Sequence, residues 1–140
     1  MKKILLLLSS LLLVSSLQAT EYGKKDRLKD MRAMTKALNH MQKGLVGTCV
    51  TCVKSGVMDL KTALRALDSV DTEDYLPKEQ ARAHKFARKM AQNIKIYAEA
   101  TLEAYNDKEY FEAMDMYNLT MNQCVSCHMR VRDWDKKGQK

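Results

Sequence analysis

Two cysteines and one histidine near the end of the chain have the types and the spacing for cofactor chemistry. The segment 124–128 reads Cys-Val-Ser-Cys-His, so His128 directly follows the pair Cys124 and Cys127. On an α-helix, at ~100° per residue, the three side chains fall within an arc of roughly 100°. Two thiols on one helical face can form thioethers with the edge of a porphyrin, and the adjacent imidazole can bind its iron. Because C-x-x-C-H is the attachment pattern of c-type haem, the sequence predicts one covalently bound haem c per chain.

A second cysteine pair has the same spacing but lacks the histidine. Cys49 and Cys52 are followed by Val53, so a second covalent haem is not expected. The two pairs together could form a four-thiolate zinc site, although residues 53–123 separate them by far more than the ~15–20 residues typical of such sites. In an oxidising compartment the simpler expectation is a local disulfide between Cys49 and Cys52. A redox-active dithiol is the alternative interpretation of this pair.

The start of the chain has the pattern of an export signal. Two lysines precede the apolar run 4–14, which is shorter than the ~20 residues that a membrane-spanning helix needs. We therefore expect a secretory signal peptide over residues 1–19, cleaved after Ala19, and no stable membrane span. The mature domain would cover residues 20–140 and would be periplasmic.

Charge and composition limit the class of partner. The chain has 24 Lys+Arg against 17 Asp+Glu, for a formal net charge of +7. A modest basic excess in an exported protein favours redox partner proteins with an acidic docking surface and argues against nucleic acid. The acidic residues are spread as on solvated helix faces, without an acid–base or nucleophile constellation, so the sequence predicts no enzyme.

Apolar residues recur at three- and four-residue intervals along four segments, which is the pattern of amphipathic helices. The stripes run from Met31 to Leu45, from Val53 to Leu67, from Ala83 to Ala104 and from Tyr110 to Val131. No segment has the two-residue alternation of a strand. Four helices of ~18–28 residues with short connections predict an all-α fold, an up-down-up-down antiparallel four-helix bundle.

Turn signals separate these four segments. Gly44 and Gly47 are expected to end the first helix, beside the first cysteine pair. Residues 68–77 form the most evident loop, and Pro77 suits the first turn of the third helix. Asn106 is expected to cap the start of the fourth helix.

An export signal, four helices and C-x-x-C-H near the end of the chain resemble class II cytochromes c, the cytochrome c-prime family. The resemblance covers essentially the whole mature chain. Family members usually continue with C-H-x-x-aromatic-basic, and here Arg132 matches the basic position while Val131 replaces the aromatic residue. In the first helix, Arg27 followed by Met31 and Arg32 is similar to the family's Arg-x-x-x-(Met/Leu)-basic segment.

The resemblance implies a role for Met31 as the sixth iron ligand, opposite His128, with Met34 as the fallback. Methionine at helical spacing is more often core filling, so the family position is what favours Met31. A thioether ligand would give six-coordinate, low-spin iron suited to electron transfer. An open position would instead give a five-coordinate haem that binds or senses nitric oxide or carbon monoxide, as many relatives do.

Other charged and titratable residues have two interpretations each. Arg132 shares a helical face with His128 and could donate to a haem propionate, or it could be a solvated terminal charge. Arg27 has the same two interpretations. His40 and His84 are alternative iron ligands in principle, but both are expected to be partly exposed histidines away from the iron.

These observations together predict a periplasmic monohaem electron carrier that belongs to no enzyme class. The alternative is a five-coordinate haem protein that binds or senses nitric oxide or carbon monoxide. A small haem enzyme is a third interpretation, and it would need a polar histidine or arginine over the iron. The resemblance leaves a homodimer open, because dimers are common in the family.

Overall fold

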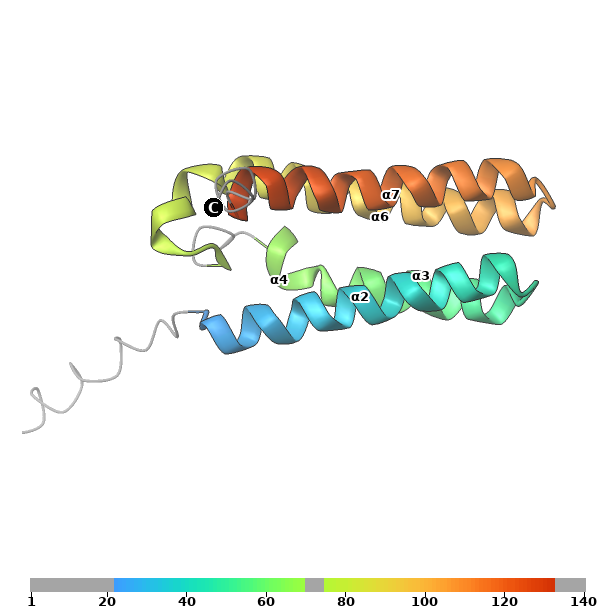
Figure 1. Cartoon of the computed structure of the whole chain (residues 1–140), viewed down its shortest axis with the longest axis horizontal. Helices are drawn as coiled ribbons and strands as arrows, with labels where there is room; N and C mark the ends of the chain where they lie inside the picture. The colour runs from blue at the N-terminus through green and yellow to red at the C-terminus, as the bar shows by residue number, and fades with distance from the viewer. Residues whose placement is uncertain (1–21, 70–74, 133–140) are drawn as a thin grey trace, which may run out of the picture.

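The computed structural model describes residues 22–69 and 75–132 (Figure 1). The signal peptide predicted for residues 1–19 lies outside these ranges. Within them, all regular structure is helical and there is no strand. No helix in the same ranges is long and apolar enough to cross a membrane.

Four long helices form two antiparallel hairpins. The elements in chain order are α2 (Lys24–Val46), α3 (Val50–Ala63), α4 (Arg65–Asp68), the 3₁₀ helix η1 (Lys78–Ala83), α6 (His84–Asn106) and α7 (Tyr110–Arg132). α2 packs along α3, α6 packs along α7, and α3 joins the hairpins by packing on α6. Successive long helices alternate in direction (Figure 1). The predicted all-α, up-down-up-down four-helix bundle is therefore confirmed.

The turn between α2 and α3 is short and closed by backbone hydrogen bonds. Thr48 adopts a left-handed conformation, with φ of 54°. This lets the Cys49 N–H reach back to the Gly44 carbonyl oxygen at 2.9 Å, the bond that closes a Schellman turn. Gly44 also allows close packing, because a Cβ there would lie 2.7 Å from the backbone nitrogen of Val53. The first helix thus ends in the glycine-containing segment, as expected from the sequence.

The turn between α6 and α7 is built in the same way, and it corrects one expectation. Asn106 does not open the fourth helix; it is the last residue of α6. Lys108 takes the left-handed position, with φ of 65°, and the Glu109 N–H donates to the Ala104 carbonyl oxygen at 2.9 Å. Helix α7 begins after Glu109, whose carbonyl oxygen accepts the first helical bond, from Ala113. Because backbone hydrogen bonds close this turn, the start of α7 needs no side-chain cap. The prediction that Asn106 caps the fourth helix is therefore wrong.

The second helix is shorter than the predicted ~18–28 residues, because it breaks at Leu64 between α3 and α4. Two polar contacts to α6 hold the end of α4. Asp68 forms an ion pair with Lys95, and Arg88 donates to the Ser69 carbonyl oxygen at 2.8 Å. The break leaves Leu67 buried at the end of the bundle where α2 begins.

The segment expected to be a loop, 68–77, contributes to the core. Its described part includes Tyr75 and Leu76, which are both buried. Pro77 precedes the 3₁₀ helix η1, which leads directly into α6. Helical periodicity predicts buried residues only within helices. It could therefore not predict that Tyr75 and Leu76, which lie in an irregular segment, are buried in the core.

Helices α2 and α7 approach each other closely over a limited part of their length. Tyr117 on α7 donates its hydroxyl to the Leu38 carbonyl oxygen at 3.4 Å, and Tyr105 on α6 donates to the Gly44 carbonyl oxygen at 3.3 Å. Both bonds link the second hairpin to the middle and the far end of α2. The space between the beginning of α2 and the end of α7 is where the candidate site lies.

Candidate haem centre

Two adjoining cavities lie between the beginning of α2 and the end of α7. Each has a volume of about 350 Å³, within the ~300–1,000 Å³ of typical ligand pockets. Their shared wall contains residues from three helices: Leu28, Met31, Leu67, Cys127 and His128. Because α2 and α7 are antiparallel, residues from opposite ends of the sequence meet in this wall.

Met31 and His128 line both cavities, one from each antiparallel helix. Met34, one helical turn further along α2, lines one of the two and is itself buried. The fold thus brings the predicted axial residues to one space, with Met31 more centrally placed than Met34.

The two other histidines lie elsewhere. His40 is near the α2–α3 turn, where its Nδ1 is 3.3 Å from the Ser55 hydroxyl. His84 donates from Nδ1 to the Ala81 carbonyl oxygen at 2.9 Å, within the first turn of the second hairpin. Neither side chain lines the two cavities.

The thiols of Cys124 and Cys127 form part of the cavity walls and are half-buried. Burial, together with the neighbouring Cys127, raises the pKa of Cys124 to about 11. Burial also raises the pKa of Cys127 above its usual value. These surroundings favour uncharged sulfur, which suits cysteines that are to become neutral thioethers better than cysteines that are to be thiolate ligands.

Two positively charged side chains lie at the edge of one cavity. Lys24 and Arg27, both from the first turn of α2, line it together with His128. The Arg27 Nη1 donates to the carbonyl oxygens of Tyr22, at 2.5 Å, and Tyr75, at 3.3 Å. Arg27 therefore sits at the cavity, fixed by two backbone contacts, and not on an open helix face. Arg132 is the last residue of α7, but its side chain lies outside the part that the structure describes.

Tyr75 is a site residue that the sequence did not reveal. It lines the same cavity, only 2% of its surface is exposed, and its ring lies 5.0 Å from that of Tyr22. Its hydroxyl has no hydrogen-bond partner among the described residues, and burial raises its pKa well above the usual value. An unpaired buried hydroxyl costs on the order of 1–3 kcal/mol. Tyr75 lines the cavity, but its hydroxyl oxygen itself has almost no accessible surface.

The residues present fit a covalently bound haem. Two uncharged thiols, an imidazole and a thioether line an apolar space, and Arg27 and Lys24 at its edge could meet the two carboxylates of a haem. Sulfur and nitrogen donors in an apolar space are compatible with an iron porphyrin.

The four-thiolate zinc alternative is wrong. Cys49 and Cys52 are joined in a disulfide, the pairing expected from the sequence. This pair lies at the α2–α3 turn, whereas Cys124 and Cys127 lie at the other end of the bundle, near the end of α7 (Figure 1). The four sulfur atoms therefore cannot converge on one ion.

Comparisons with protein-family models, with curated proteins and with solved structures find no match.

Proposed function

We propose that this chain is an exported c-type cytochrome that carries single electrons on one covalently bound haem. The observation that carries the proposal is the convergence of Met31 and His128 on the same two cavities, with Cys127 in the shared wall. A helical face that offers C-x-x-C-H and a thioether from the facing helix together would supply the covalent attachment and the residues that bind the iron.

Each residue of the site has a stated role in this proposal. Cys124 and Cys127 would hold the group through thioether bonds, and His128 and Met31 would bind its iron. Bound in this way, the haem supplies reversible one-electron chemistry at its iron. Leu67, which is buried, and Leu28 line the walls, and an apolar wall around the iron would help to set the reduction potential.

The edge of the cavity also suits a protein partner. Lys24 and Arg32 are exposed and line the cavities, and Lys25 and Lys29 are exposed on the same first turns of α2. A cationic surface next to the cofactor steers partners with acidic docking surfaces into a productive orientation. The proposal therefore includes periplasmic redox proteins as donor and acceptor.

Absorption spectra of the ferric and ferrous protein, with and without carbon monoxide, test this function. The proposal predicts a low-spin, six-coordinate spectrum in both oxidation states and no ready binding of carbon monoxide. A high-spin spectrum that responds to carbon monoxide or nitric oxide would contradict the proposal and support a five-coordinate gas-binding or sensing protein. Free release of the haem would contradict both.

A further inference from the structure

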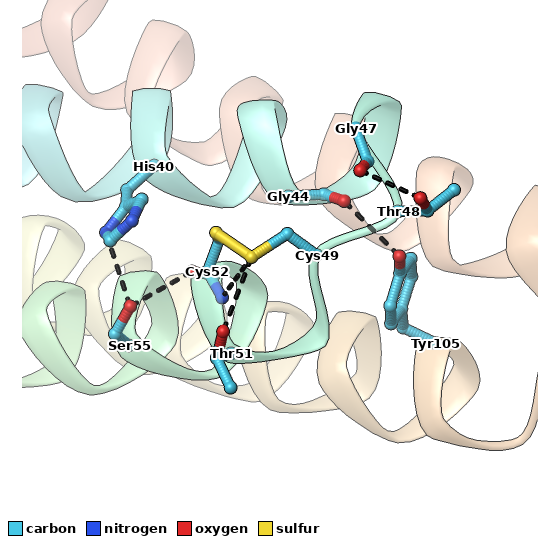
Figure 2. Close-up of a disulfide and its surroundings, with 9 residues drawn as sticks. All are labelled: His40, Gly44, Gly47, Thr48, Cys49, Thr51, Cys52, Ser55 and Tyr105. Carbon is cyan, nitrogen blue, oxygen red and sulfur yellow. Dashed lines mark hydrogen bonds between the residues drawn. A yellow bond between two sulfur atoms is a disulfide. The ribbon is translucent and has the colours of Figure 1, made fainter.

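The Cys49–Cys52 disulfide is not used by the proposed haem function. It lies at the far end of the bundle, where α2 turns into α3 (Figure 2). Cys49 is the residue that caps the N-terminus of α3, and Cys52 is in the first turn of that helix. Both side chains are half-buried, and their neighbours Val50 and Thr51 are exposed. An incoming thiol can therefore approach the pair from solvent.

Two hydrogen bonds end on the same sulfur atom. The Cys52 N–H donates to Cys49 Sγ at 3.2 Å, and the Thr51 hydroxyl lies 3.4 Å from Cys49 Sγ (Figure 2). Because a disulfide sulfur carries no hydrogen, Thr51 is the donor in this second bond. Both donors are aimed at Cys49, so the two sulfurs of the pair are not equivalent.

This arrangement favours negative charge on Cys49. A thiolate there would keep both hydrogen bonds and would sit at the positive end of a helix dipole. Cysteines at helix N-termini in C-x-x-C motifs have lowered pKa values and take part in thiol–disulfide exchange for this reason. When reduced, Cys49 is therefore the more reactive nucleophile of the pair, and it is also a good leaving group from a mixed disulfide with a partner.

The surrounding structure does not depend on the S–S bond. Val53 is fully buried one turn into α3, and Gly44 allows the backbone of α2 to approach it closely. Tyr105 ties the same glycine to α6, and the Ser55 hydroxyl donates to the Cys52 carbonyl oxygen at 3.3 Å. The loop that the disulfide closes is also short, which limits its contribution to stability. The bond can therefore open while the helices stay in place.

We propose that Cys49 and Cys52 form a reversible thiol–disulfide exchange centre whose partner is a protein dithiol. A thiolate of the partner attacks Cys49 Sγ and forms a mixed disulfide, while the Cys49–Cys52 bond breaks and Cys52 leaves as a thiolate that takes a proton. The partner's second thiolate then attacks its own sulfur in the mixed disulfide and releases Cys49 as a thiolate. The partner dithiol is oxidised to a disulfide, and the Cys49–Cys52 disulfide is reduced by the same two electrons.

The first test exposes the full processed protein at pH 7 to reduced bacterial thioredoxin as the probe dithiol. Alkylation and peptide mapping by mass spectrometry count Cys49 and Cys52 separately from Cys124 and Cys127, so the result does not depend on the haem proposal. We expect the pair to become reduced while circular dichroism stays helical, and to reoxidise with glutathione disulfide. A pair that stays oxidised with excess thioredoxin, yet opens under denaturing reduction, would overturn the proposal.

The second test asks which sulfur reacts. In the reduced protein at pH 7, Cys49 should be alkylated roughly tenfold faster than Cys52, because two hydrogen-bond donors and the N-terminus of α3 stabilise a thiolate at Cys49. Thr51→Val should slow alkylation of Cys49 several-fold by removing one donor. Thr62→Val, an exposed threonine in the last turn of the same helix, is the matched control and should have no effect. Equal rates for both cysteines, or equal behaviour of the two threonine variants, would contradict the proposal.

A pair of single-cysteine variants gives an independent readout. Cys52→Ser should form a mixed disulfide with glutathione at Cys49 rapidly, whereas Cys49→Ser should do so slowly at Cys52. The reverse order would refute the assignment of Cys49 as the exchanging sulfur.

Discussion

At the scale of residues, Met31 and Met34 illustrate why spacing alone does not identify an iron ligand. They lie on nearly the same face of α2, one turn apart, yet only Met31 lines both cavities together with His128. Met34 is buried at 6% exposure and packs in the main core. The two methionines are therefore expected to respond differently to substitution.

Met31→Ala should convert a low-spin spectrum to high-spin and open the iron to carbon monoxide, because the thioether is lost. Met34→Ala should leave the ligation intact and lower the free energy of unfolding by about 2–5 kcal/mol, as for other buried methionines. Absorption spectra with and without carbon monoxide and chemical denaturation measure the two effects. If Met34→Ala alone changes the spin state, the assignment of Met31 is wrong.

If the proposed function is right, the haem should remain bound when the protein is denatured in acid and organic solvent, because two thioether bonds would hold it to Cys124 and Cys127. Mass spectrometry of the denatured chain should show the mass of one haem. Haem that extracts into the organic phase would refute covalent attachment. A mass corresponding to two haems would show that Cys49 and Cys52 are also attached to one.

Tyr75→Phe removes the buried, unpartnered hydroxyl of a residue that lines the cavity, without changing the shape of the ring. If the hydroxyl donates to a haem carboxylate, this variant of the loaded protein should be less stable by about 1 kcal/mol and should have a shifted reduction potential. Tyr97→Phe, in α6 away from the cavities, is the control. A more stable Tyr75→Phe protein would indicate that the hydroxyl stays unpaired when haem is bound.

At the scale of elements, α2 and α3 pack unusually closely through small residues. A Cβ at Gly56 would lie 2.6 Å from the Met41 Cγ and 2.8 Å from the Met41 backbone nitrogen. A side-chain atom can move away, but the backbone of a buried helix cannot. Gly56 therefore sets the distance between the two helices of the first hairpin.

Gly56→Ala should lower the free energy of unfolding by about 1–3 kcal/mol through overpacking, despite the higher helix propensity of alanine. Lys54→Ala, on the exposed face of the same helix, should change it by no more than about 0.5 kcal/mol. Thermal and denaturant unfolding of the two variants compare these effects directly. A Gly56→Ala protein more stable than wild type would show that α2 and α3 can separate without cost.

At the scale of the whole molecule, the bundle keeps two sulfur chemistries apart. The disulfide lies beyond the C-terminal end of α2, and Met31 lies near its beginning, roughly 25 Å away along the helix axis. The polar contacts of the disulfide are with its own turn and first helical turn, and none of them reaches the cavities. Reduction or reoxidation of the disulfide is therefore expected to leave the cavities near Met31 unchanged.

Reduction of the Cys49–Cys52 pair, with the iron held in one oxidation state, should leave the haem spectrum unaltered. The melting temperature should fall only slightly. A typical disulfide contributes ~2–4 kcal/mol to the free energy of unfolding, and this one should contribute less because the loop that it closes is short. Spectra and melting curves recorded before and after selective reduction test both statements. A spectral shift on reduction of this pair alone would show that the two ends are coupled.

The helical class and the turn at Gly44 and Gly47, before the first cysteine pair, could be predicted from the amino-acid sequence alone, and so could the C-x-x-C-H motif at 124–128. Periodic apolar stripes and C-x-x-C-H are local signals, because the residues that carry them are neighbours on one helix. The sequence did not determine the break at Leu64 or the role of Tyr75. Both depend on what α4 and the segment before η1 meet across the bundle. Only the tertiary structure decided that Met31, and not another methionine, shares two cavities with His128, because that proximity exists only where antiparallel helices from opposite ends of the chain face each other.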